Sequence, residues 1–312
     1  MADPLVTIIC PTFNRGALLH CALQSVLRQD FTDFEMRVMG DGCTDDSEKI
    51  VAGFNDARLH WYNFPKNSGN QSGPNNEGVR RARGKFIAFI GHDDLWFPWH
   101  LARLVKHINE TGADLVHDFA ASVGRDGIEG FYGAPHPRSG YERIYFPTSS
   151  WLHRRELAAH IGHWRQPDEL AWAIDYDFSR RAALAGKRIS FLPSLGVLKF
   201  HSQVWKFYAH TGPPPQEKWL GALQKNPAAL NEEVLLQFAA LSAHYFQDQD
   251  KTPFGLAWEE TKKSVKNAAR ALVREIIFNY GHDRWPVQAV LRRRMKRLRA
   301  RQRITRGLTN AP

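Results

Sequence analysis

Residues Phe86-Ile87-Ala88-Phe89-Ile90-Gly91-His92-Asp93-Asp94 hold the strongest structural signal in the chain. The apolar run before Gly91 is typical of a strand that is buried on both faces of a parallel sheet. The two adjacent carboxylates that follow repel each other unless a cation or hydrogen-bond donors neutralise them. An aspartate at this place would equally suit a helix N-cap. The stretch therefore predicts either a cation site or a helix start at the end of a central strand.

Upstream, apolar runs and segments with helical spacing alternate. We expect strands at Leu5–Cys10, Phe34–Met39 and Arg58–Asn63, and helices at Ala17–Gln29, Asp46–Phe54 and Gly78–Arg83. This alternation predicts a parallel sheet with helices on both faces. Ligands bind such sheets beyond the carboxyl ends of the strands. Three polar segments follow those ends, so we expect them to converge in one crevice: Pro11-Thr12-Phe13-Asn14, Asp41-Gly42 and Asp93-Asp94.

Beyond Pro98 the regular alternation is lost. We expect helices at Leu101–Glu110 and Leu170–Ala185, strands within Asp114–Val123 and at Ile189–Pro193 and Gly196–Phe200, and loops or hairpins over Gly124–Gly140. The strongest linker signal is Gly212-Pro213-Pro214-Pro215, and Glu232–Phe246 and Trp258–Asn279 after it have helical spacing. We therefore expect an α/β domain over 1–205, with halves 1–95 and 96–205, a helical extension over 206–286 and a basic tail over 287–312.

Composition places the chain among ordinary globular proteins. Its 312 residues are 43% hydrophobic and 24% charged, and no run approaches 18 apolar residues, so we expect no membrane-spanning helix. Three cysteines and no visible secretory signal favour a reducing cytoplasm. The net charge is +10, but nine basic residues and no acidic one lie between Val287 and Pro312, so the remaining chain carries only about +1. High net charge therefore gives no argument for specific nucleic-acid binding by the body of the protein.

Several further motifs together resemble the family 2 glycosyltransferases, which have the GT-A fold. The matching segments, in chain order, are Val6–Arg15, Leu23–Gln29, Asp33-Phe34-Glu35, Gly40–Asp45, Asn76-Glu77-Gly78, Ala82–Phe89, Asp93-Asp94-Leu95-Trp96, Ser149–Arg155 and Asp175-Tyr176-Asp177-Phe178 with Arg181. The resemblance covers about residues 4–205. It implies a mostly parallel, Rossmann-like sheet and inverting transfer of a sugar from a nucleotide-sugar donor to a hydroxyl.

The resemblance also implies roles for individual residues. Asp175 takes the position of the family's general base, Asp94 that of the metal ligand, and Asp93 would contact the ribose or metal-bound water. His201 would reach the metal or the diphosphate, and the cofactor would be Mn²⁺ or Mg²⁺. The remaining donor-binding residues would be Pro11, Thr12, Asn14, Asp41 and Asn76. This chemistry suits the residue types, because a sugar hydroxyl needs a carboxylate to take its proton and a divalent ion stabilises the leaving diphosphate.

Other interpretations stay open at this point. Gly40 and Gly91 stand where the family usually has aspartates, so a scaffold that kept the fold and lost turnover is one alternative. Asp175 and Asp177 could instead lie on a solvated helix face beside Arg180 and Arg181. His201 could be an ordinary surface histidine. A protein that binds anionic polymers through its tail is a third function, and it predicts binding that falls steeply with salt.

The acceptor expected from the resemblance is a growing bacterial cell-surface glycan or a lipid-linked sugar. In the tail, Val287, Leu291, Met295 and Leu298 form a narrow apolar stripe among basic residues, which is typical of a helix that binds an anionic membrane surface. A solvated cationic terminus is the alternative. We therefore expect a cytoplasmic protein that Val287–Arg306 holds at the inner face of the cell membrane.

Overall fold

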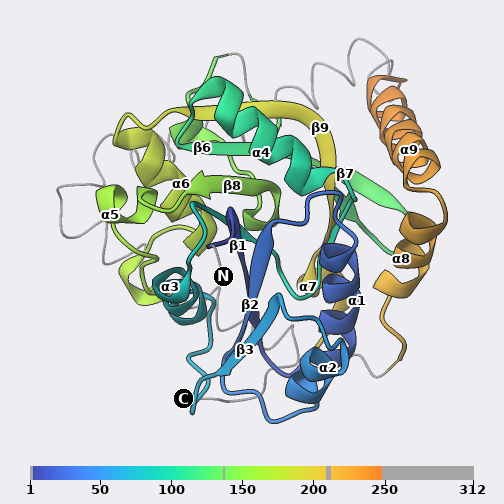
Figure 1. Cartoon of the computed structure of the whole chain (residues 1–312). Coiled ribbons are helices and arrows are strands. Elements are labelled where there is room, and N and C mark those ends of the chain that lie inside the picture. Colours follow the sequence, from blue (N-terminus) through green and yellow to red (C-terminus); the bar gives the residue numbers. More distant parts are fainter. Residues whose placement is uncertain (1–2, 136–137, 209–211, 248–312) are drawn as a thin grey trace.

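The computed structural model describes residues 3–135, 138–208 and 212–247, and Figure 1 shows its elements in chain order. The first half contains β1 (Val6–Thr12), α1 (Gly16–Leu27), β2 (Phe34–Gly40), α2 (Ser47–Gly53), β3 (Leu59–Asn63), α3 (Ser72–Arg81), β4 (Phe86–Phe89), β5 (Leu95–Trp96) and α4 (His100–Thr111). The second half contains β6 (Leu115–Val123), β7 (Ile128–Tyr132), β8 (Trp151–Arg154), α5 (Leu157–Ile161), α6 (Ile174–Leu184), β9 (Ile189–Phe200), α7 (Ser202–Trp205), α8 (Gln216–Lys225) and α9 (Pro227–Gln247).

One sheet with the strand order β3-β2-β1-β4-β8-β6-β9-β5 organises the molecule, and β7 pairs with β6 beside this path. Strands β3, β2, β1 and β4 are parallel, and in β1 Ile8 lies between Met36 of β2 and Ala88 of β4. Beyond β4 the sheet becomes mixed, because β8 runs antiparallel to both β4 and β6. The predicted α/β class with a mostly parallel, Rossmann-like half is therefore confirmed.

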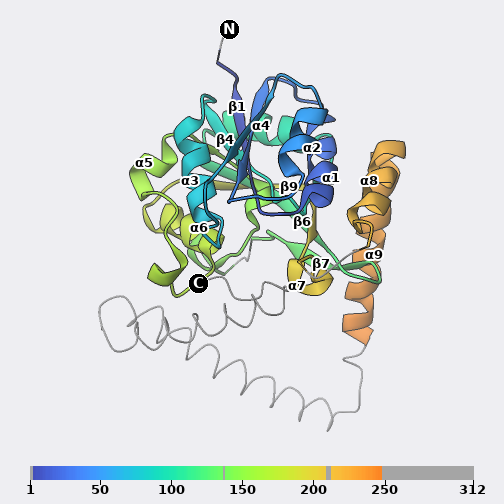
Figure 2. The same ribbon diagram turned by 90° about the horizontal axis from the view of Figure 1, so that it is seen from below.

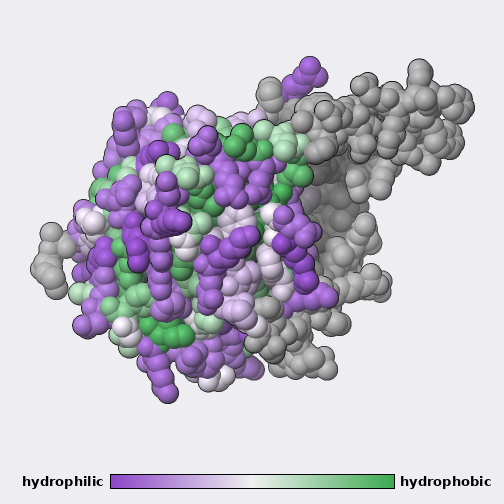
Figure 3. Space-filling view, turned by 90° about the vertical axis from the view of Figure 1, so that its right-hand side faces the viewer, coloured by the Kyte–Doolittle hydropathy of each residue, from purple (hydrophilic) through white to green (hydrophobic). Residues whose placement is uncertain are grey.

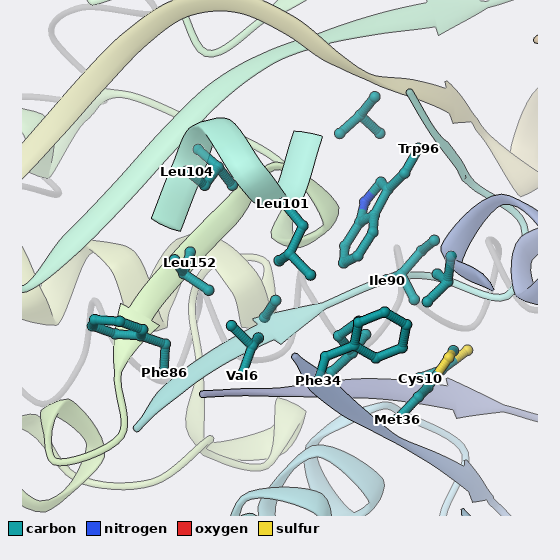
Figure 4. Close-up of a cluster of buried hydrophobic side chains, with 14 of the residues drawn as sticks. Val6, Cys10, Phe34, Met36, Phe86, Ile90, Trp96, Leu101, Leu104 and Leu152 are labelled. Atoms are coloured by element: carbon teal, nitrogen blue, oxygen red, sulfur yellow. The ribbon is translucent and has the colours of Figure 1, made fainter. Parts of the chain in front are cut away.

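Strand β1 shows why the sheet is covered on both faces. Val6, Ile8 and Cys10 point to one side, where they join a core with α1 and α4, and Ile9 points to the other side, against Gly78 of α3. Figure 4 shows the first of these cores, in which the strand residues Val6 and Cys10 lie with Leu101 of α4. All four of these strand residues are fully buried. The unbroken apolar run is the expected sequence of a strand with no solvent-facing side.

Most predicted elements are present, with shifts at their ends. Helix α3 begins at Ser72, six residues before the predicted start at Gly78. Strand β9 joins the two strands predicted at Ile189–Pro193 and Gly196–Phe200. It passes through Pro193 because its pairing with β6 is interrupted between Phe191 and Leu195, where no ladder donor is needed.

The described part of the predicted extension packs directly on the domain. Trp219, Leu220 and Leu223 of α8 share a core with Leu18 and Cys21 of α1. Figure 2 shows α8 beside α1, and α9 continuing toward β7. On the face in Figure 3, the described atoms are mostly hydrophilic, with hydrophobic side chains scattered among them. The helix predicted at Trp258–Asn279 and the basic tail lie outside the described residues, and the domain limits stay a prediction.

Within the part of the chain that the structure describes, no helix is both long and apolar enough to cross a membrane.

Candidate active site

The polar ends of the three predicted strands meet. The backbone N–H of Asp41 donates to the carbonyl of Thr12 over 2.8 Å, which joins the ends of β2 and β1. The Nδ1 atom of His92 lies 3.3 Å from the carbonyl oxygen of Pro11, which joins the end of β4 to β1. The predicted convergence at the carboxyl edge of the parallel strands is therefore confirmed.

Asp94 is fully buried behind this edge, where four hydrogen bonds hold its carboxylate. The Nζ atom of Lys199, from the end of β9, donates to Oδ1 over 3.1 Å and to Oδ2 over 2.9 Å. The Oδ2 atom also accepts from the hydroxyl of Ser149 over 2.5 Å, and Oδ1 accepts from the backbone N–H of Phe200 over 3.1 Å. Burial alone would lower the pKa of Lys199, but the charges of Asp94 and Asp93 outweigh it and raise that pKa. The two side chains thus form a buried ion pair.

This geometry does not fit the role of metal ligand that the resemblance gave to Asp94. A carboxylate offers about four lone-pair sites, and the four hydrogen bonds to Asp94 use them. Asp93 fits better, because its side chain is partly exposed and its carboxylate accepts no hydrogen bond from any residue within the described ranges. Among the described residues no three His, Cys, Asp or Glu side chains gather into a metal cage. An ion at Asp93 would need oxygens of a bound diphosphate to complete its shell.

Asp175 lies in the first turn of α6, and its charge interacts with that of Lys199. We call Lys199, Asp93 and Asp94 the Lys199 cluster, because their charges also interact. The Oδ2 atom of Asp175 accepts from the hydroxyl of Tyr145 over 2.9 Å, and its Oδ1 atom accepts from the backbone N–H of Tyr176 over 2.9 Å. Burial raises the pKa of Asp175, while the Tyr145 hydrogen bond and the charge of Lys199 act in the opposite direction. The carboxylate is therefore partly desolvated, which strengthens it as a proton acceptor.

Asp177, two residues further along α6, has a different environment. Its Oδ2 atom lies 2.8 Å from the Nε atom of Arg181, and its Oδ1 atom lies 3.8 Å from Arg165. Asp177 thus has an arginine partner, as the alternative interpretation expected, but it is buried and does not lie on a solvated helix face. Only Asp175 faces the Lys199 cluster.

Aromatic rings connect the base candidate to the end of β9. The ring of Tyr132 lies 5.6 Å from that of Tyr145 and 5.4 Å from the imidazole of His201, both edge to face. His201 follows Phe200 directly and occupies the N-cap position of α7. The site candidates of the second half of the sequence therefore lie along one wall, with Asp175 at one end and His201 at the other.

Asp41 organises a loop at the end of β2. Its carboxylate accepts hydrogen bonds from the side chain of Asn67 over 3.0 Å, from the hydroxyl of Ser68 over 2.8 Å, and from the backbone N–H groups of Ser68 and Gly69 over 3.0 and 3.2 Å. The side chain is only 5% exposed. Asp41 therefore shapes the wall of the crevice through residues 67–69.

The other predicted donor-binding residues also hold loops together. The side-chain oxygen of Asn14 accepts from the backbone N–H of Thr44 over 2.7 Å, and Asn14 itself has a positive φ of 46°. The amide of Asn76 exchanges two hydrogen bonds of 2.9 Å with the backbone of Trp164, so it links α3 to the acceptor half. Thr12 is buried, and Pro11 is partly exposed at the crevice.

The two glycines that replace expected aspartates fit tightly. A Cβ atom at Gly91 would lie 2.7 Å from the Oδ1 atom of Asp93, and one at Gly40 would lie 2.7 Å from the ring of Trp61. Larger side chains at both places would displace neighbouring groups. The neighbouring side chains therefore lie in the space that the two glycines leave, and at Gly91 that neighbour is Asp93.

Three site residues were not identified from the sequence: Lys199, Ser149 and Tyr145. A signal did exist for Lys199, because a lysine inside the apolar run Gly196–Phe200 must find a counter-charge when the strand is buried. Ser149 was matched only as the first residue of the segment Ser149–Arg155, with no role of its own, and the local sequence around Tyr145 gives no signal.

A parallel half-sheet joined to a mixed half, with acidic residues at the junction, defines the GT-A class of glycosyltransferase folds. Solved structures agree. The first 349 residues of TarS from S. aureus, in complex with UDP-GlcNAc, superpose with a TM-score of 0.54 at 22% identity over 75% of this chain and 71% of that one. The mannosyltransferase PcManGT from Pyrobaculum calidifontis, in complex with GDP-Man and Mn²⁺, gives 0.51 at 19% identity over 99% and 88%. At these identities the likeness establishes the fold.

Residues 7–156, just under half of the chain, match the sequence profile of the family described as glycosyl transferase family 2. The poly(ribitol-phosphate) beta-N-acetylglucosaminyltransferase TarP of Staphylococcus aureus is 32% identical over 141 residues, which are 44% of this chain and 41% of TarP. A GalNAc(5)-diNAcBac-PP-undecaprenol beta-1,3-glucosyltransferase of Campylobacter jejuni is 35% identical over 112 residues, 34% and 35% of the two chains. The matched stretches thus span less than half of these relatives.

Proposed function

We propose that this protein is an inverting glycosyltransferase that moves a sugar from a nucleotide-sugar donor to a hydroxyl of a glycan or lipid-linked acceptor. One observation carries the proposal: the carboxylate of Asp175 is desolvated, has no arginine partner among the described residues, and interacts with the charge of Lys199. Similar proteins act on polymer and lipid-linked acceptors, as the names of TarP and the Campylobacter enzyme state.

In this proposal Asp175 takes the proton of the acceptor hydroxyl. The Tyr145 hydroxyl, 2.9 Å from Oδ2, and the Tyr176 N–H, 2.9 Å from Oδ1, fix the orientation of the carboxylate. A base held this way takes the proton from an acceptor hydroxyl in one fixed position, so the hydroxyl attacks the donor from one side, which suits single displacement with inversion. The environment of Asp177 supports the choice between the two aspartates, since its carboxylate is paired with Arg181.

The divalent cation, Mn²⁺ or Mg²⁺, belongs to Asp93 and His201 in this proposal, in place of Asp94. When bound, such an ion neutralises the charge of the leaving nucleoside diphosphate. The partly exposed carboxylate of Asp93 supports its selection, and so does the position of His201 directly after the strand that carries Lys199. The nucleotide would lie in the crevice between the ends of β1 and β2, against Pro11 and Thr12, with walls shaped by Asn14, Asp41 and Asn76.

Association with an anionic membrane surface through Val287–Arg306 stays part of the proposal, supported by the nine basic residues between Val287 and Pro312. Each basic residue near such a surface contributes about 1 kcal/mol. A position at the inner face of the cell membrane would bring the enzyme to a lipid-linked acceptor.

The test is a panel of UDP-, GDP- and dTDP-sugars, with release of the nucleoside diphosphate measured in Mn²⁺, in Mg²⁺ and in excess chelator. We expect one donor to be turned over in the presence of metal, and Asp175→Asn to bind that donor without turning it over. If the wild-type protein binds nucleotides but releases no nucleoside diphosphate from any donor, the result would support the scaffold alternative instead.

A further inference from the structure

Lys199 lies at the junction of the site, with its ammonium group fixed from one side. Two of the three N–H donors of an ammonium point to the Asp94 oxygens, at 2.9 and 3.1 Å. Among the described residues no other acceptor takes the third donor. The side chain of Lys199 is 17% exposed and that of Asp94 is 0% exposed, so Lys199 is the member of the pair that solvent reaches.

Three carboxylates surround this ammonium, and their charges bear on whether an anion can bind there. Asp93, Asp94 and Asp175 all interact electrostatically with Lys199. Three carboxylates near one edge would repel a nucleoside diphosphate, and repulsion between charges in a partly buried site is weakly screened. A fixed ammonium that is partly exposed and has one N–H donor not taken by a described residue can offset this repulsion locally, because charge-assisted bonds to phosphate oxygens are short and strong.

Holding such a charge in place requires support, which the structure supplies. A buried lysine is unfavourable unless its charge is paired and hydrogen-bonded. Asp94 provides the pair, and Ser149 and the Phe200 N–H hold the Asp94 carboxylate at 2.5 and 3.1 Å. Each of these groups acts on the orientation of the lysine, and none of them reaches further into the crevice.

We propose that Lys199 binds the diphosphate of the donor, and that Asp94 is a positioning residue that acts through Lys199 and does not ligate a metal. The inference rests on the proposed function, since it needs a nucleotide-sugar donor. It adds to the site a charge that stays in place when the divalent ion is absent. Asp94 and Asp93, although adjacent, therefore have separate roles.

The experiment measures binding of UDP and GDP, and of uridine and guanosine, by titration calorimetry in excess chelator. Lys199→Met should weaken binding of the preferred nucleoside diphosphate by about tenfold to a hundredfold and leave the nucleoside unchanged. Lys199→Arg keeps the charge and should restore most of the affinity. Lys106→Met is the matched control, because Lys106 is 75% exposed on α4, and it should bind like the wild type.

The outcomes separate the two proposals. If the Lys199→Met variant binds UDP or GDP as well as the wild type does, or if it loses nucleoside and nucleoside-diphosphate binding alike, the role of Lys199 is overturned and the proposed function stands. Wild-type protein that binds no nucleotide with or without Mn²⁺ would overturn both. If Lys199→Met does not fold, Asp94→Asn/Lys199→Met removes both charges together and should show the same selective loss.

Direct Mn²⁺ titration in the presence of the bound nucleoside diphosphate tests the role of Asp94. We expect Asp93→Asn to weaken Mn²⁺ binding and Asp94→Asn to leave it near the wild-type value. A loss in Asp94→Asn as large as that in Asp93→Asn would show that Asp94 is a ligand and would refute its assignment as a positioning residue.

Discussion

Replacing Asp175 with asparagine tests the proposed base with a minimal change of shape. Asparagine keeps an oxygen that can accept the bond from Tyr145 or from the Tyr176 N–H, but it cannot take a proton at neutral pH. Positioned general bases contribute about 10²–10⁴ in rate, which equals about 3–5 kcal/mol of transition-state stabilisation. We expect kcat for transfer to fall by that factor, with donor affinity unchanged.

The same substitution should not weaken the fold. Burial raises the pKa of Asp175 in the folded protein above its usual value. The folded state therefore binds a proton more tightly than the unfolded state, so at neutral pH the ionised carboxylate reduces stability. Asp175→Asn should leave the free energy of unfolding equal or higher.

Asp177→Asn is the matched control with the opposite pattern. The Asp177 carboxylate is paired with Arg181 at 2.8 Å, and both side chains are about nine-tenths buried. Losing this charged hydrogen bond should lower the free energy of unfolding by about 1.5–3 kcal/mol and leave the transfer rate of the folded protein near wild type.

The assay combines single-turnover transfer, donor titration and urea unfolding for the wild type and both variants. We expect a rate loss without a stability loss for Asp175→Asn, and a stability loss without a rate loss for Asp177→Asn. If Asp177→Asn abolishes transfer while Asp175→Asn retains it, the base has been assigned two residues too early.

Three further outcomes are expected. Tyr145→Phe removes a donor to the carboxylate form of Asp175, so the pKa of that base should rise further and the acidic limb of the pH–rate profile should move to higher pH; an unchanged profile would contradict this. Gly196→Ala would place a Cβ atom against the buried carboxylate of Asp118, so urea unfolding should show a loss of several kcal/mol, and wild-type stability would refute the clash. Truncation after Pro286 should abolish binding to anionic vesicles at low salt and keep donor hydrolysis; equal vesicle binding by both proteins would rule out the tail as the anchor.

The nucleotide half of the fold follows closely from sequence periodicity. Strand β2 was predicted as Phe34–Met39 and is observed as Phe34–Gly40, because its apolar run and its terminating glycine are both local features. The mixed half was harder. Strand β8 contains a histidine and an arginine, and its burial between β4 and β6 depends on contacts that are distant in sequence. The composition of a short segment does not predict which distant strands it will pair with.

The site shows the same division. The rule for parallel strands predicts that Asp93 lies near the ends of β1 and β2. Asp175, in the first turn of α6, was assigned only from the resemblance. The different roles that we propose for Asp93 and Asp94 could not be predicted, because they depend on which of the two carboxylates binds Lys199. Lys199 is 105 residues away from Asp94 in sequence, so the partner is selected by the path of β9.

Helix α8 has a consequence for protein engineering. Its first residue, Gln216, is fully buried and donates a hydrogen bond of 3.0 Å to the carbonyl of Asp93, and Gln224 bonds Gln24 of α1 over 2.7 Å. A chimera that joins residues 1–205 to a foreign acceptor module would remove this support from the metal-site candidate and expose the apolar face of α1. A junction placed after residue 247 would keep both, so modularity in this chain begins later than the proline-rich segment at 212–215 suggests.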